Sequence, residues 1–163
     1  MFHDRESTEN AYKTLQEKGY TKDEINIVMS GDTLKKQFSG NHKHTEFGTY
    51  TIKNATYDST IVSNDSTIAD VIGSNGRSVI ERGNVIILVG PISSGISGSG
   101  ASGIPGGIIA ALVDSGFSRA SANIYEAGIK KGDIVLGVQI HNEEDAKYLK
   151  NDWRTNKVEE IHI

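Results

Sequence analysis

A long uncharged segment, Val85–Val113, occupies the middle of this sequence. It exceeds the ~20 residues that a helix needs to cross a bilayer. However, serine, glycine and the chain's 2 prolines fill its middle, and only its two ends are strongly apolar. We therefore interpret the segment as a buried, glycine-rich part of a folded assembly. The alternative interpretation is a membrane-associated protein that inserts residues 85–113.

Small residues recur in this segment every four positions. One series consists of Gly95, Ser99, Gly103, Gly107 and Ala111. On a helix, small side chains at i and i+4 form a flat groove that lets another backbone approach closely. The spacing therefore predicts a glycine zipper, with these five residues contacting a second copy of the chain or another protein. A flexible loop is the alternative structure for this segment, because glycine lowers helix stability by ~1 kcal/mol per position relative to alanine.

The same glycines allow a different interpretation. Residues 98–103 match the G-x-G-x-x-G pattern in which glycines let a phosphate approach backbone amides. In a dinucleotide-binding fold, an acidic residue about 20 positions further on lies at a strand end. Here that residue would be Asp114 or Glu126, and both fall in or beside predicted helices. A small-ligand or nucleotide-binding module using this loop is therefore the second alternative.

Local signals predict elements on both sides of the segment. Asp4 and Gly19 bound a helix over residues 5–18, and Ser118 and Gly132 bound another over 119–131. Alternating apolar residues predict a strand over 134–140. The remaining expectations are strands at 1–3, 25–29, 85–89 and 158–163, and helices at 32–38, capped by Asp32, 106–113 and 142–153, capped by Asn142.

This order of elements predicts an α+β fold. Without its central part and the helix that follows it (119–131), the chain reads βαβ–βαβ, which is typical of a ferredoxin-like core with its helices on one face of the sheet. We expect a single domain over 1–163, with the core formed by 1–38 and 117–163. The insertion, 39–116, divides into a polar part with irregular structure or short strands (39–83) and the glycine-rich part (84–116). The rival fold is an open parallel sheet with helices on both faces.

Composition narrows the function further. The chain has a net charge of -4, which argues against nucleic-acid binding, and it has no cysteine, which excludes disulfides and thiolate chemistry. Its first residues lack the apolar core of a secretory signal, so we expect a cytoplasmic protein. His42 and His44 lie two apart in a polar stretch that we interpret as a solvated loop. We expect no metal, no cofactor and no catalytic residue.

Several motifs resemble a known family. They are Phe2-His3-Asp4 with Ala11 and Leu15, then Gly19-Tyr20 with Ile25 and Val28, and a block from Gly106-Gly107 through Gly116, Ala122, Tyr125-Glu126, Gly128 and Gly132 to Val138. Over 1–38 and 84–163 the chain is similar to the bacterial general stress protein 17M-like (heat-induced stress protein) family. The resemblance implies a stress-associated, non-enzymatic bacterial protein. It also singles out Tyr125, whose ring we expect in the core with its hydroxyl toward a partner.

Overall fold

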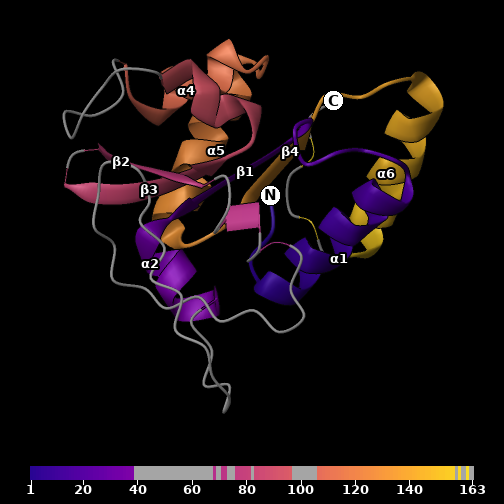
Figure 1. Cartoon of the computed structure of the whole chain (residues 1–163), viewed down its shortest axis with the longest axis horizontal. Helices are drawn as coiled ribbons and strands as arrows, with labels where there is room; N and C mark the ends of the chain where they lie inside the picture. The colour runs from indigo at the N-terminus through magenta and orange to yellow at the C-terminus, as the bar shows by residue number, and fades with distance from the viewer. Residues whose placement is uncertain are drawn as a thin grey trace.

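The molecule is an α+β protein built around one antiparallel sheet (Figure 1). The computed structural model describes residues 1–38, 68, 71–72, 76–81, 83–96, 106–156, 158 and 161. Four strands pair in the order β2-β3-β1-β4. Their bounds are β1 (Ile25–Ser30), β2 (Arg77–Glu81), β3 (Asn84–Val89) and β4 (Val135–Val138).

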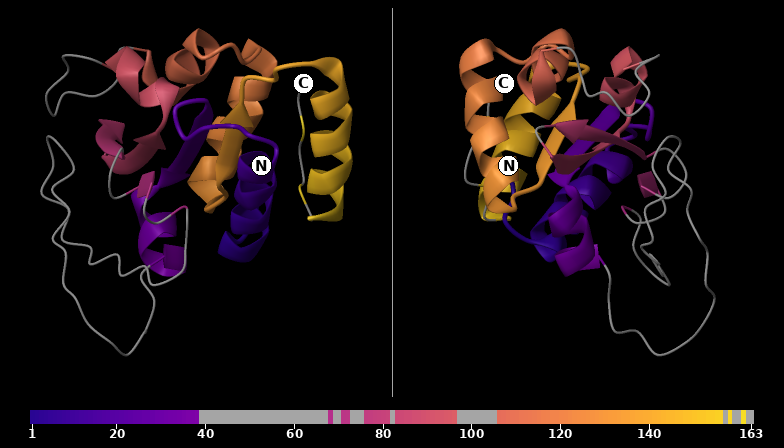
Figure 2. Two further views of the ribbon diagram at one scale, coloured as in Figure 1. Left: turned by 45° about the vertical axis from the view of Figure 1, so that its right-hand side comes forward. Right: turned by 90° about the vertical axis from the view of Figure 1, so that its left-hand side faces the viewer.

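Helices cover both faces of this sheet (Figure 2). Helices α1 (Arg5–Glu17) and α6 (Glu143–Thr155) lie on one face, and α4 (Gly107–Asp114) and α5 (Arg119–Lys131) lie on the other. Three short pieces complete the described elements. They are α2 (Gly31–Thr33), the π-helix η1 (Leu34–Phe38) and the 3₁₀ helix η2 (Pro91–Ile96).

The two-sided arrangement follows from the strands' own residues. Successive side chains of a strand point to opposite faces. Ile27 and Met29 of β1 join the apolar cluster under α1 and α6, whereas Val28 joins the cluster under α4 and α5. In β3, Ile87 and Leu88 divide in the same way. Because these strands are apolar at consecutive positions, each needs a helical layer on both sides.

The ferredoxin-like core, with 5–18 and 142–153 as its helices, stays a prediction. The corresponding helices α1 and α6 lie on the same face of the sheet, and α5 lies on the other face. The bounds of the insertion also stay a prediction. Residues 84–89, which the sequence placed in the glycine-rich insertion, form β3, an inner strand paired with both β1 and β2.

The predicted helix ends are mostly confirmed. Asp4 accepts a hydrogen bond from the Ser7 backbone amide at 2.8 Å, so it caps α1 as expected. Ser118 caps α5, and Gly132 ends α5 with a φ of 110°. Asn142 caps α6 in the same way. The prediction of Asp32 as a cap is wrong, because the Ser30 side chain caps α2 by accepting from the Thr33 amide at 3.0 Å.

The predicted strands at the two ends of the sequence differ from the structure. Residues 1–3 contribute a single bridge, between Phe2 and Ile134, rather than a strand. Of the predicted strand at 158–163, the described residues Val158 and Ile161 are not in a strand and pack against the α1–α6 cluster. Strand β2 lies in the polar part, 39–83, for which short strands were one expectation, but its position was not predicted. It pairs with β3 through a short connection that contains Gly83.

Candidate functional site

The predicted glycine zipper does not form one continuous helix in this structure. Gly106 and Gly107 have φ values of 82° and 73°, and α4 begins only at Gly107. A right-handed helix cannot pass through residues with positive φ. Gly95 lies in η2, whereas the predicted residues Ser99 and Gly103 lie outside the described residues, as does the whole 98–103 motif. The structure therefore corrects the prediction of a helical groove running through Gly107.

Gly107 has a local reason to be glycine. The Glu81 side chain at the end of β2 reaches the start of α4, where its Oε2 accepts a hydrogen bond from the Ile108 amide at 3.1 Å. The φ of 73° at Gly107 strains any other side chain, and a Cβ there would also displace the end of the flexible Glu81 side chain. The amides of a helix's first turn lack partners within the helix, so a carboxylate there stabilises the helix start. Gly107 thus lets the Glu81 carboxylate reach the start of α4 and join β2 to this helix.

The other two predicted interaction residues are buried within the chain. Ala111 of α4 is 7% exposed and Tyr125 of α5 is 4% exposed. The Tyr125 ring packs edge-on against Phe117, with ring centroids 5.4 Å apart and an interplanar angle of 90°. The expectation that this ring packs in the core is confirmed. Both side chains contact the chain's own elements, which corrects their prediction as contacts for a second molecule.

The outer surfaces of α4 and α5 carry exposed apolar side chains. Val113 of α4 is 36% exposed, and Ile124 of α5 is 40% exposed. Ala120 and Ala127 are also exposed and share a face of α5 with Ile124, because they lie four positions before it and three after it. We call these four residues the α4–α5 surface. The sequence did not indicate this surface, because the spacing of its small residues predicted an interface in the preceding glycine-rich segment.

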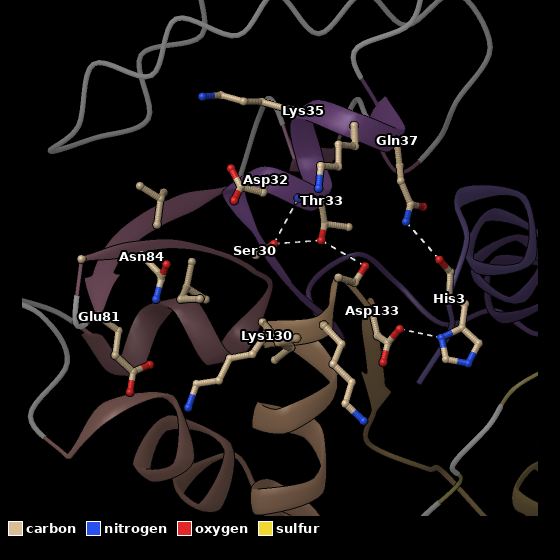
Figure 3. A pocket seen from close by; sticks show the side chains of 17 residues that line it. His3, Ser30, Asp32, Thr33, Lys35, Gln37, Glu81, Asn84, Lys130 and Asp133 are labelled. Carbon is tan, nitrogen blue, oxygen red and sulfur yellow. Dashed lines mark hydrogen bonds and ion pairs between the residues drawn. The ribbon is translucent and has the colours of Figure 1, made fainter.

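A polar pocket lies where β1 and α5 both end, at their C-terminal residues (Figure 3). Its volume is about 640 Å³, within the usual range for small-molecule sites. Its walls come from the N-terminal segment, from β1 with α2 and η1, from the β2–β3 connection and from the C-terminal end of α5. These segments are far apart in the sequence, so the sheet pairing creates the pocket.

Two pairs of lysines line this pocket. Lys35 and Lys36 come from η1, and Lys130 and Lys131 come from the end of α5. The Lys130 Nζ lies 2.8 Å from Glu126 Oε1, one helical turn back on α5. For Lys36 and Lys131, the structure shows no ion pair with any residue that it describes. Both lysine pairs are visible in the sequence, but no sequence pattern indicated that they line the same pocket.

Hydrogen bonds fix the wall of the pocket at the α5–β4 junction. The buried carboxylate of Asp133 lies 2.5 Å from His3 Nδ1, and Gln37 Nε2 donates to the His3 carbonyl at 3.0 Å. Thr33 Oγ1 donates to the Gly132 carbonyl at 3.0 Å. Figure 3 shows His3 and Asp133 on one side of the pocket and Lys130 and Glu81 on the other. The pocket is therefore held in shape by contacts between distant segments.

A second polar cluster lies at the other end of β1. His141 Nε2 lies 2.5 Å from Glu24 Oε1, and the His141 ring stacks on Tyr20 with centroids 4.2 Å apart. The Tyr20 hydroxyl donates to Asp145 Oδ2 at 3.3 Å. The Thr21 amide is the largest cause that lowers the pKa of Glu24 from 4.5 to about 2, followed by the hydrogen bond with His141. This cluster fastens the α1–β1 loop to the start of α6.

No group of three metal-ligating side chains gathers among the residues that the structure describes, and His42 and His44 lie outside them. In the described part of the chain, no helix combines the length and the apolar character required to cross a membrane. The two ends of the uncharged segment belong to β3 and α4.

Comparison with known proteins does not extend these observations. No family model matches the chain, and no similar protein was found among curated sequences or solved structures. The resemblance to the general stress protein 17M-like family therefore stays a prediction from the sequence.

Proposed function

We propose that this chain is a non-enzymatic protein that acts by associating with a second copy of itself through the α4–α5 surface. The observation that carries the proposal is the exposure of Ile124 between Ala120 and Ala127 on α5, with Val113 exposed on the adjoining helix. Burying apolar surface stabilises an interface by roughly 25 cal/mol per Å². Small neighbours around a larger apolar side chain allow two helices to approach closely.

The wider role in this proposal comes from the sequence. Its resemblance to the general stress protein 17M-like family supports a role in the bacterial stress response, in the cytoplasm. The association surface that we propose differs from the predicted glycine zipper. It uses the outer faces of α4 and α5, because Ala111 and Tyr125 are buried within the chain.

The test is the solution mass of the purified protein and of the variant Ile124→Glu. We expect the wild-type chain to form an oligomer whose mass, measured by light scattering, rises with protein concentration. A buried glutamate without a partner strongly disfavours an apolar interface, so Ile124→Glu should be a monomer over the same range. The matched control is Tyr148→Glu on α6, where the exposed tyrosine lies on the other face of the sheet.

The control variant should keep the wild-type mass, and circular dichroism should show that both variants keep the wild-type helix content. A wild-type protein that stays monomeric at every concentration contradicts the proposal. An oligomer that survives Ile124→Glu places the interface elsewhere and equally contradicts it.

A further inference from the structure

We propose that the polar pocket is a binding site for a phosphate dianion carried by a small molecule, with Lys36 and Lys131 as its main contacts. This inference is independent of self-association, because the α4–α5 surface contributes none of the pocket's lining residues. It rests on the placement of charge around the pocket, on the pocket's size and on the fixed shape of its walls.

Some charged side chains of the pocket have an ion-pair or hydrogen-bond partner, and others have no ion pair. Asp133 is held by His3, and Glu81 accepts from the Ile108 amide at the start of α4. Lys130 is held by Glu126. Within the described part of the chain, this leaves Lys36 and Lys131 as cations without an ion pair and Asp32 as a carboxylate without one. Because two cations and only one carboxylate lack an ion pair, the pocket favours a ligand with more than one negative charge.

The two lysines come from elements that lie far apart in the sequence. Lys36 belongs to η1, which follows β1, and Lys131 is the last residue of α5. A tetrahedral dianion offers several acceptor oxygens, so it can accept from both ammonium groups at once. Each lysine has a long flexible stem that keeps its charged head at the solvent side of the pocket.

The carbonyl groups at the end of α5 do not oppose an anion as strongly as an open helix end would. A helix C-terminus is normally negative, because its last carbonyls lack partners. Here Thr33 Oγ1 donates to the Gly132 carbonyl, and Ser30 Oγ lies 2.8 Å from the same threonine oxygen. Since the single Thr33 proton goes to the carbonyl, Ser30 donates to Thr33. This chain of hydrogen bonds partly neutralises the helix end beside the lysines.

The pocket has room for more than the phosphate group. Its volume of about 640 Å³ exceeds what one phosphate ion fills and is in the range that small organic ligands occupy. Asp32 and Asn84 also line it and can bind hydroxyl groups. A phosphate monoester of a small polyhydroxylated molecule therefore satisfies both the cations and the open carboxylate.

The experiment is a titration of the labelled full chain followed by amide chemical shifts, at constant ionic strength and about pH 7.5, where phosphate is mainly dianionic. The probes are inorganic phosphate and glycerol 1-phosphate, with sodium chloride and acetate as comparison salts. We expect saturable shifts at the pocket residues with both phosphates and none with the comparison salts. The ester should bind at least as tightly as inorganic phosphate.

The variants Lys36→Gln and Lys131→Gln should each weaken phosphate binding about tenfold, the loss expected for one charge-assisted hydrogen bond. Lys147→Gln is the matched control, because this exposed lysine lies on α6, away from the pocket. Asp32→Asn should tighten binding of inorganic phosphate severalfold by removing the open negative charge.

Three outcomes would overturn the proposal. The first is a titration in which chloride or acetate gives the same shifts as phosphate, which indicates general screening of surface charge. The second is an equal loss of affinity in Lys147→Gln and the two pocket variants. The third is an ester that binds more than tenfold more weakly than inorganic phosphate, which excludes a ligand that fills the remaining space.

Discussion

Single glycines decide several close contacts in this molecule, and their surroundings differ sharply. Gly90 follows β3 with a φ of 88°, and a Cβ there would collide with the backbone carbonyl of Ile25. Gly19, after α1, has the same φ, but a Cβ there would meet nothing within 4 Å. Comparing Gly90 with Gly19 therefore separates the energetic cost of a positive φ from the cost of crowding by a new Cβ.

We expect Gly90→Ala to destabilise the fold more than Gly19→Ala does. The left-handed conformation costs a non-glycine residue roughly 1–2 kcal/mol, and this cost applies to both variants. Crowding against a rigid backbone adds roughly 1–3 kcal/mol in Gly90→Ala alone. Urea denaturation measures the free energy of unfolding of both. Equal losses in the two variants would show that the Ile25 carbonyl yields to the new methyl group.

Glu24 should make stability depend on acid pH. Its pKa is lowered to about 2 in the folded chain, by the Thr21 amide first and by His141 second. A lowered carboxyl pKa stabilises the fold above the unfolded-state value, and that contribution is lost as pH falls toward the folded-state value. The difference in stability between the wild type and Glu24→Gln should therefore be full above about pH 4.5 and shrink toward pH 2.

The measurement is the urea midpoint of both proteins across this pH range. A difference that stays constant down to pH 2 would contradict the assignment of the pKa shift to Glu24.

At the level of elements, local sequence signals predicted the helices, and alternating apolar residues predicted one apolar face of a strand. Capping residues such as Ser118 and Asn142 lie next to the amides that they bind, so short sequence patterns predict them. Strand β2 carried a weaker signal, the apolar pair Val79-Ile80 before a turn with Gly83. It becomes a strand because β3 supplies hydrogen bonds along its whole length. That support comes from tertiary pairing, which local patterns do not report.

Helix α6 gives a direct test of capping. The Asn142 side chain accepts from the Asp145 amide at 2.8 Å, and the helix buries Leu149 and Trp153 against α1 and the sheet. Removing the cap in Asn142→Ala should lower the free energy of unfolding by about 1 kcal/mol. Asn142→Ser keeps an acceptor oxygen and should lose less, as measured by urea denaturation. A serine variant as unstable as the alanine variant would exclude capping as the cause.

At the scale of the whole molecule, the apolar runs of β1, β3 and β4 contained the signal for two covered faces. Ile27-Val28-Met29 and Val135-Leu136 are apolar at consecutive positions and contribute to both clusters. Such runs are typical of strands buried on both sides. The polar pocket carried no comparable signal, since its lysine pairs are brought together only by the path of the chain between β1 and α5.

Because β1 and β3 contribute to both clusters, the two faces should unfold together. Leu15→Ala on the α1 face and Leu112→Ala on the α4 face each remove a fully buried side chain and should cost about 2–5 kcal/mol. The single tryptophan, Trp153, lies on the α1 face. Leu112→Ala should nevertheless shift the tryptophan fluorescence transition as far as the circular dichroism transition. Separate midpoints for the two signals would show that the faces unfold independently.

The position of β1 between β3 and β4 has a consequence for biosynthesis. A ribosome releases β1 early, but β4 follows more than a hundred residues later in the chain. Until β4 emerges, one side of β1 presents unpaired amides and carbonyls next to apolar side chains, and exposed strand edges of this kind promote aggregation. The nascent polypeptide therefore needs protection, by chaperones or by rapid elongation, until its last strand is synthesised.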